Sequence, residues 1–191
     1  TTMNMIVGYL PMTSGTIKIN GIDISENPKE AKKNIGYLPE IPPLYPDMKV
    51  IEYLKFVAGI KGIKKQDRAF QIDRAMSRLK ITDKKNRVIK NLSKGYKQRV
   101  GFAQALLGDP KVIILDEPTV GLDPSQTKEV RDLIKKLGKD HTIIFSSHIL
   151  SEVNAVADRI LIINNGEIKA QDTTNNLEVD RNEVILKLDI E

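Results

Sequence analysis

Two adjacent carboxylates at the end of an apolar run are the residues best suited to chemistry in this sequence. Val112 to Leu115 are consecutive apolar residues, which is typical of a buried strand, and Asp116, Glu117 and Pro118 follow directly. Proline cannot continue the hydrogen bonding of a strand, so the strand should end here. The carboxylates then lie at the carboxyl end of a strand, where open α/β sheets place their ligands. One carboxylate can hold magnesium and the other can orient or deprotonate a water, although the same pattern occurs where a strand meets a solvated turn.

A second feature is the start of a helix that we expect from Ser93 to Leu107, with Val100, Ala103 and Leu107 facing inward. The free N–H groups and the dipole of a helix N-terminus, next to a small hydroxyl, can bind an anion. The simpler interpretation is that Ser93 only caps the helix.

These features occur with further motifs in a fixed order. Residues 92–99 read Leu-Ser-Lys-Gly-Tyr-Lys-Gln-Arg, residues 121–123 read Gly-Leu-Asp after the acidic pair, and residues 146–148 read Ser-Ser-His after the next apolar run. In that order and spacing, the set resembles the nucleotide-binding domain of ATP-binding-cassette (ABC) transporters. It is most similar to the subunits that serve bacterial export-type or multidrug permeases. The resemblance extends from residue 1 to about residue 170.

The resemblance implies roles for the acidic residues and the histidine. Asp116 would hold Mg²⁺ and Glu117 would be the general base that acts on the attacking water. Glu40 stands where the family usually has a glutamine that reaches Mg²⁺ and this water, and a carboxylate oxygen can still ligate Mg²⁺. His148 would contact the γ-phosphate of ATP. Without the resemblance, Glu117 and Glu40 would be read as solvent-facing acids and His148 as incidental.

The remaining binding residues are also implied by the resemblance. Ser93 and Gly95 would contact the γ-phosphate held by a second copy of the domain, although Lys94 and Tyr96 replace a glycine and a glutamine of the usual Leu-Ser-Gly-Gly-Gln form. Asp123 would lie at the interface between the two copies, and its simpler role is to cap the following helix. Thr1 and Thr2 would donate to the α-phosphate, or would only form the first helical turn.

The phosphate-binding loop of the family has no counterpart in this sequence. No G-x-x-x-x-G-K-[ST] motif occurs in the 191 residues, and Thr1-Thr2 resembles the stretch that follows such a loop. We therefore expect a truncated chain or an incomplete record of a longer protein, and we expect the chain alone to be inactive.

The strand and helix patterns predict a single α/β fold. Strands that alternate with helices indicate a mostly parallel sheet, and the resemblance implies a P-loop NTPase-like sheet with an antiparallel β side sheet and an inserted helical subdomain at 41–92. Residues 1–180 would form the ABC ATPase domain, and 181–191, with alternating apolar residues at 184–190, would begin a C-terminal extension. We expect hairpins at Asn20-Gly21 and Asn165-Gly166. The apolar patterns predict strands at 34–40 and 142–148 and helices at 50–58, 69–79, 124–137 and 150–157. One more helix is predicted at the start of the chain by the apolar residues Met3, Ile6, Val7 and Leu10.

Composition restricts the class of protein. The chain has no cysteine and no apolar run near the ~20 residues that cross a bilayer. Its net charge is +5, but lysine and arginine are scattered among acids, as on solvated faces. With no tryptophan and few aromatic residues, a platform for stacking bases is not expected, and we predict no nucleic-acid partner.

The resulting prediction is an ATPase with ATP and Mg²⁺ as cofactors that powers a membrane transporter. Its partners would be a second copy and integral-membrane permease subunits, at the inner face of the cell membrane, with Tyr45 and Pro46 as docking contacts or as ordinary loop packing. A two-cassette ribosome factor and a purely structural role for the fragment stay open. A chromosome-maintenance ATPase is disfavoured, because only a short helical segment separates Glu40 from Ser93.

Overall fold

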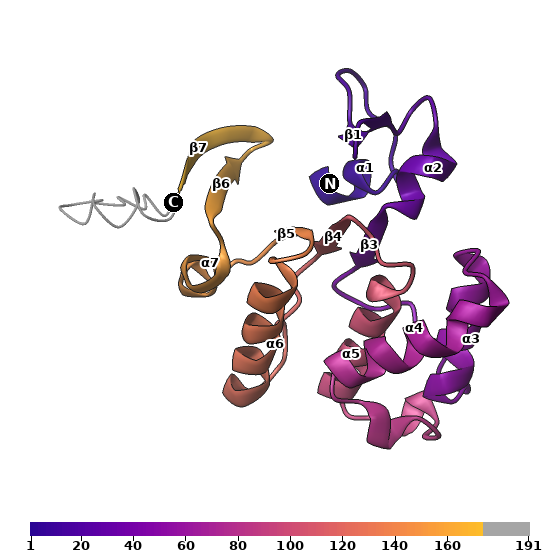
Figure 1. The fold of residues 1–191 in the computed structure, drawn as a ribbon. Helices are drawn as coiled ribbons and strands as arrows, with labels where there is room; N and C mark the ends of the chain where they lie inside the picture. The colour runs from indigo at the N-terminus through magenta and orange to yellow at the C-terminus, as the bar shows by residue number, and fades with distance from the viewer. Residues whose placement is uncertain (174–191) are drawn as a thin grey trace. The chain divides into compact units, whose positions relative to one another are not determined.

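A three-stranded parallel sheet organises the first part of the chain. The structure, a computed structural model, describes residues 1–173. Strands β3 (Ile35–Leu38), β4 (Val112–Leu115) and β5 (Thr142–Phe145) pair in parallel in the order β3-β4-β5 (Figure 1). Leu38, Leu115 and Phe145 are in register. The segments that follow the three strands therefore share one edge of the sheet, as the sequence predicts for the acidic pair.

Helix α5 (Lys94–Leu106) packs against β3 and forms much of the core. The close approach depends on Gly36, because a Cβ atom there would lie 2.3 Å from the carbonyl oxygen of Ala105. Val100, Ala103 and Leu107 are buried, which confirms the inward face expected for this helix. Helix α6 (Pro124–Leu137) ends at Gly138, also as expected.

The segment between β3 and α5 is helical. It contains α3 (Val50–Ile60), α4 (Lys65–Arg78) and two short 3₁₀ helices, η1 (Thr82–Lys84) and η2 (Ile89–Asn91). Figure 1 shows α3, α4 and α5 lying together. The apolar spacing predicts both α-helices because Val50, Leu54, Ile72 and Met76 point inward, and all four are buried.

A small antiparallel sheet and two short helices precede β3. Strands β1 (Lys18–Ile19) and β2 (Ile22–Asp23) are joined by Asn20 and Gly21, which have φ of 51° and 80° as a type I′ turn requires. Helices α1 (Thr2–Ile6) and α2 (Pro28–Lys33) flank this hairpin. A core cluster joins these elements to the sheet through Ile19, Ile24, Ala31, Ile35 and Ile114.

Two expectations for this region are wrong or incomplete. The apolar spacing predicts a helix that reaches Leu10, but α1 ends at Ile6 because Gly8 has a φ of 69°, and Leu10 is exposed. Helix α2 is not predicted, although Pro28 at its first position and Glu30 in its first turn are helix-start signals.

The chain divides into two compact units, residues 1–148 and the part from residue 149 onward. In the described part of the second unit, α7 (Leu150–Val156) precedes strands β6 (Arg159–Asn164) and β7 (Glu167–Thr173). These strands form the expected hairpin, with Asn165 and Gly166 at positive φ. The expected strand at 184–190 and the extension at 181–191 lie outside the described residues.

The fold class is the one expected from the sequence. It is α/β, with a parallel sheet, an antiparallel side sheet and an inserted helical segment. In residues 1–173, none of the helices combines the length and the apolar character that crossing a bilayer would require.

Candidate functional site

The two carboxylates after β4 are connected through a serine of the neighbouring strand. The Ser146 hydroxyl donates to Oδ1 of Asp116 at 2.6 Å and accepts from the backbone N–H of Glu117 at 2.9 Å. Because β4 and β5 pair in parallel, the residue after Phe145 lies beside the residue after Leu115. The hydroxyl fixes both the Asp116 side chain and the Glu117 backbone.

The backbone of Glu117 has an uncommon conformation. Its φ is 47°, in the left-handed region that non-glycine residues seldom adopt. The hydrogen bond from its N–H to Ser146, and that from the N–H of Val120 to its carbonyl at 3.2 Å, hold this turn. Strained conformations of this kind gather at functional sites, where the surroundings fix them.

His148 contacts the carboxylate of Glu117. Its Nδ1 lies 3.0 Å from Oε2 of Glu117, and a carboxylate only accepts, so the ring N–H donates. The Glu117 side chain is 20% exposed and the His148 side chain 66%. The carboxylate of Glu117 is therefore mostly buried and is held by a histidine that faces solvent. The structure thus joins three of the predicted site residues, Asp116, Glu117 and His148, in one hydrogen-bonded group.

Glu40 lies at the same edge of the sheet. It follows β3 by two residues, and β3 is the neighbour of β4. Its side chain is exposed, and no hydrogen bond or ion pair joins it to another residue in the described range 1–173. Position in the fold, rather than a direct contact, relates Glu40 to the acidic pair.

Helix α1 reaches the carboxyl half of β3 through Tyr37. The Tyr37 hydroxyl donates to Oδ1 of Asn4 at 3.4 Å. Burial, and to a smaller extent the negative charge of Asp116, raise the pKa of the Tyr37 phenol. Tyr37 therefore lies between α1 and the acidic pair. Thr1 and Thr2, at the start of α1, are exposed.

The remaining predicted residues form a second group at the starts of α5 and α6. The hydroxyl of Ser93 accepts from the N–H of Tyr96 at 3.4 Å, so Ser93 caps α5. A Cβ atom on Gly95 would lie 2.4 Å from Oε1 of Gln126, which places the α5 backbone directly against the first turn of α6. Asp123 caps α6 by accepting from the N–H of Gln126 at 2.8 Å.

Two polar residues make connecting hydrogen bonds around the site, although the sequence predicts no role for them. The first is Ser146, which links the Asp116 side chain to the backbone of Glu117. Gln98 is the second: it is buried and its Nε2 donates to the carbonyl of Pro118 at 3.4 Å, which ties α5 to the loop after the acidic pair. Helical spacing could have predicted that Gln98 is buried, because it shares a helix face with the buried residues Phe102 and Ala105.

The donor set at the sheet edge suits a hard cation. Asp116, Glu117 and Glu40 offer carboxylate oxygens, which are ligands that Mg²⁺ prefers. Within residues 1–173 no three acidic or histidine side chains gather into a complete cage. Mg²⁺ is usually held in proteins by one or two carboxylates, with water and substrate phosphate oxygens completing its shell.

Comparisons with known proteins identify the family. The family model described as ABC transporter matches residues 1–120. The chain is 38% identical over 186 residues to the uncharacterized ABC transporter ATP-binding protein YhcH of Bacillus subtilis (strain 168), covering 96% of this chain and 60% of the relative. It is 40% identical over 170 residues to the bacitracin transport ATP-binding protein BcrA of Bacillus licheniformis, covering 88% and 55%.

A solved structure shares the fold. The structure of cbiO1 from Clostridium perfringens, part of the ABC transporter complex cbiONQ, superposes with a TM-score of 0.83 at 27% identity, covering 94% of this chain and 74% of that one. The chain spans 60% or less of the length of the two bacterial relatives. With a family model that matches more than half of its residues, and with the cassette fold and motif order described above, the chain belongs to the ABC transporter family, among its ATP-binding proteins.

Proposed function

We propose that this chain is the ATP-binding and ATP-hydrolysing part of a subunit that powers a membrane transporter. The observation that carries the proposal is the hydrogen-bonded group of Asp116, Ser146, Glu117 and His148 at the carboxyl edge of the sheet. A transport role is supported by the relatives, one of which is a bacitracin transport protein. The transported substrate and its direction are left open.

Glu117 is proposed as the general base. ATP hydrolysis needs a positioned water and stabilisation of the charge that develops on the γ-phosphoryl group. The Glu117 carboxylate would accept a proton from this water, and the His148 N–H would hold the carboxylate in place while the exposed ring reaches the γ-phosphate.

Asp116 and Glu40 are proposed as magnesium ligands. When bound, Mg²⁺ supplies positive charge that offsets the negative charge of the phosphate oxygens. The Ser146 hydroxyl leaves Oδ2 of Asp116 available by bonding to Oδ1. Glu40 adds a second oxygen donor from the loop after β3.

A second copy of the chain is proposed to complete each site. Two copies would close head to tail on two ATP molecules, so that the N-terminus of α5 meets the γ-phosphate bound to the other copy. Ser93 and the N–H of Gly95 would be the donors at this helix end. Asp123 would face the interface while it caps α6. Thr1 and Thr2 would donate to the α-phosphate.

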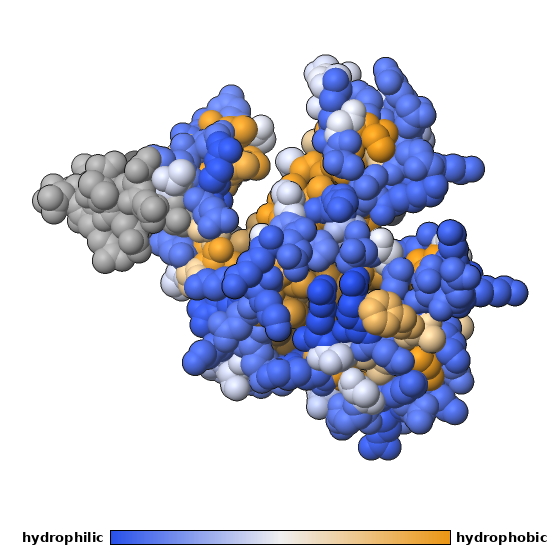
Figure 2. All heavy atoms as spheres, in the orientation of Figure 1, coloured by the Kyte–Doolittle hydropathy of each residue, from blue (hydrophilic) through white to orange (hydrophobic). Residues whose placement is uncertain are grey.

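The permease is proposed to dock on the aromatic residues beside the helical segment. Tyr45 is 50% exposed and packs edge-on against Phe56 with ring centroids 5.3 Å apart. Figure 2 shows exposed apolar surface within the mainly hydrophilic surface over α3 and α4. The ring contacts fix Tyr45 while half of it stays available to a partner, so loop packing and docking are compatible. Pro46 would extend this contact, and the subunit would lie at the inner face of the cell membrane.

The decisive experiment is Glu117→Gln in a full-length protein that contains this chain. The substitution keeps the shape and removes the base, so the steady-state kcat for ATP hydrolysis should fall by roughly 10²-fold or more. The variant should form a stable ATP-bound dimer, measured by light scattering after gel filtration. Glu26→Gln, at an exposed turn residue, is the control and should leave both readouts unchanged. Normal turnover by Glu117→Gln would remove Glu117 from the base role.

The chain by itself is proposed to be inactive. Its sequence has no G-x-x-x-x-G-K-[ST] motif, so the backbone cradle and the lysine that bind the β- and γ-phosphates in P-loop proteins are not encoded in these 191 residues. Release of phosphate from ATP by the purified 191-residue chain should not exceed that of the Glu117→Gln form of the same chain.

A further inference from the structure

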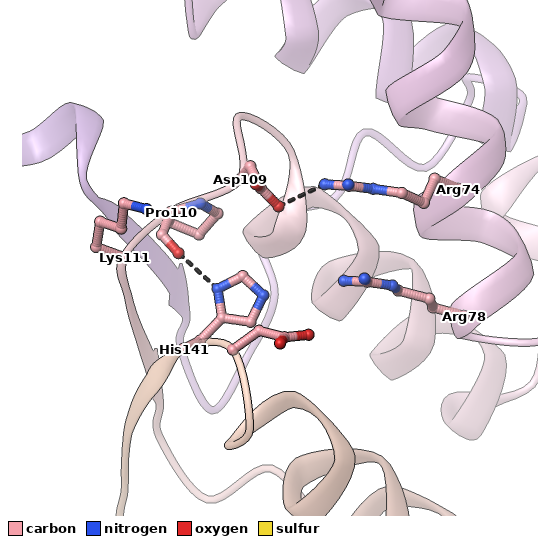
Figure 3. A pocket seen from close by; sticks show the side chains of 7 residues that line it. Arg74, Arg78, Asp109, Pro110, Lys111 and His141 are labelled. Carbon is pink, nitrogen blue, oxygen red and sulfur yellow. Dashed lines mark hydrogen bonds and ion pairs between the residues drawn. The ribbon is translucent and has the colours of Figure 1, made fainter.

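A cavity at the opposite edge of the sheet gathers basic side chains from three segments. It has a volume of about 150 Å³ and is lined by Arg74, Arg78, Asp109, Pro110, Lys111, Asp140 and His141 (Figure 3). Lys111 directly precedes β4 and His141 directly precedes β5. At about 3.3 Å per residue, β4 places this cavity roughly 15 Å from Asp116, so it is separate from the candidate nucleotide site.

The basic side chains that line this cavity are not all paired with acidic residues in the described part of the chain. Arg74 forms an ion pair with Asp109, which leaves further guanidinium N–H groups of Arg74 available. Arg78 and Lys111 have no side-chain hydrogen bond or ion pair with any residue in the described part of the chain. Figure 3 shows the side chains of Arg74 and Arg78 extending from α4 toward the loop that carries Asp109 and toward His141. Of the two carboxylates that line the cavity, Asp109 is paired with Arg74 and Asp140 has no ion-pair partner among residues 1–173.

His141 is oriented by a hydrogen bond to the backbone. Its Nδ1 lies 2.7 Å from the carbonyl oxygen of Pro110, and because a carbonyl only accepts, Nδ1 carries the hydrogen. The other ring nitrogen faces the arginine side chains in Figure 3. This nitrogen carries no hydrogen in the neutral ring, so it donates to an anion only from the protonated imidazole.

We propose that this cavity binds a tetrahedral oxyanion, either inorganic phosphate or the phosphate of a monoester. At about 30 Å³ for each water in the liquid, the volume holds roughly five waters, enough for one such anion that keeps part of its hydration. Arg78 and Lys111 supply the charge, and Arg74 supplies N–H donors in an orientation fixed by Asp109. The bound anion joins α4 of the helical segment to the amino edge of the parallel sheet.

The test is calorimetric titration of the 191-residue chain with sodium phosphate, with sodium sulfate and with phosphoserine. Ionic strength is held constant with sodium chloride. We expect saturable 1:1 binding, and we expect the double variant Arg78→Gln/Lys111→Gln to bind at least ten-fold more weakly. Lys18→Gln/Lys29→Gln removes the same charge from exposed sites outside the cavity and should bind like the unmodified chain. Tighter binding of phosphoserine than of phosphate would assign the monoester as the ligand; equal or weaker binding would assign the inorganic ion.

Two results would overturn the proposal. One is no saturable binding of any of the three anions; the other is equal binding by the Arg78→Gln/Lys111→Gln variant and the unmodified chain. Backbone amide NMR shifts locate the site independently, and they should move at Lys111 and His141 during the titration.

The role of His141 is tested with sulfate, which does not titrate near neutral pH. The charged and titratable groups that line the cavity with it are Arg74 and Arg78 on α4, Asp109 and Lys111 before β4, and the adjacent Asp140. His141→Phe keeps a ring at this position and removes both nitrogens, so it should weaken sulfate binding several-fold at a fixed pH. Equal binding by His141→Phe and the unmodified chain would contradict the role given to the imidazole.

Discussion

The hydroxyl of Ser146 makes two hydrogen bonds at the candidate site, one to the Asp116 carboxylate and one to the backbone of Glu117. It donates to Asp116 and accepts from the N–H of Glu117, whose backbone is strained. Ser146→Ala leaves that N–H without its acceptor, so the free energy of unfolding should fall by about 1–3 kcal/mol. Urea denaturation of the 191-residue chain measures this change. Ser146→Thr keeps the hydroxyl and is the matched control; an alanine variant as stable as the parent would show that water replaces the hydroxyl without loss.

Lys61 is a buried cation that neutralises no acid but holds the end of a helix. Its ammonium donates to the carbonyls of Gln104 at 2.9 Å, Ala105 at 3.3 Å and Leu107 at 2.8 Å, at the C-terminus of α5, where the regular hydrogen bonding of the helix ends. Burial nevertheless lowers the pKa of Lys61 to about 8, against about 10.4 in an unfolded chain.

This lowered pKa predicts a pH-dependent stability. Between about pH 8 and 10 the unfolded chain binds the proton that the folded chain has lost, so the contribution of Lys61 to the free energy of unfolding rises with pH in this window. Lys61→Met has no titrating group at this position. The free energy of unfolding of the parent minus that of the variant should therefore increase by about 1 kcal/mol per pH unit. A difference that is constant from pH 7 to pH 10 would contradict the lowered pKa.

At the residue scale, the acids and the histidine of the candidate site are easier to predict from the sequence than the polar groups that hold them. Asp116, Glu117 and His148 stand out because acids and a histidine follow apolar strands, and the structure brings them together. Ser146 and Gln98 make common hydrogen bonds whose partners lie 20 to 30 residues away, and spacing in the sequence does not encode such contacts. Glu40 is placed by the order of the strands alone.

At the scale of elements, backbone conformation decides which predicted turns and helix ends are correct. Gly21 has a φ of 80° and no atom within 4 Å of an added Cβ, so Gly21→Ala should cost about 1 kcal/mol through backbone strain alone. Gly138 ends α6 with a φ of −60° and only ordinary contacts around an added Cβ. Gly138→Ala should therefore be neutral or slightly stabilising. Thermal unfolding of both variants tests the pair, and equal effects of the two substitutions would refute this explanation.

The same principle explains which elements the sequence predicted. Both Asn-Gly hairpins formed as expected because this dipeptide adopts positive φ at both positions. Helix α1 was predicted too long because its apolar spacing continues past Gly8, whose positive φ ends the helix. Helix α2 was missed because its six residues carry one buried side chain, Ala31, and so have almost no apolar periodicity.

At the scale of the whole molecule, buried apolar side chains are distributed unevenly along the chain. Among the described residues, residues 113–115 of β4 and most residues of α5 are buried, whereas β6 and β7 contain a single buried residue, Ile160. Local opening costs little free energy where few apolar contacts must break. The amides of β6 and β7 should therefore exchange with solvent much faster than those of β4 and α5, even though the two strands pair along their length with one irregularity between Ile162 and Ile163.

Native-state hydrogen exchange of the 191-residue chain, followed by mass spectrometry or NMR, measures this difference. We expect the amides of β4 and the centre of α5 to exchange only through unfolding of the unit that contains residues 1–148, so their protection should fall in parallel as urea is added. The β6–β7 amides should exchange by local opening that depends little on urea. Equal protection and equal urea dependence in both regions would mean that the chain unfolds as one cooperative body, and the division after His148 would then have no energetic counterpart.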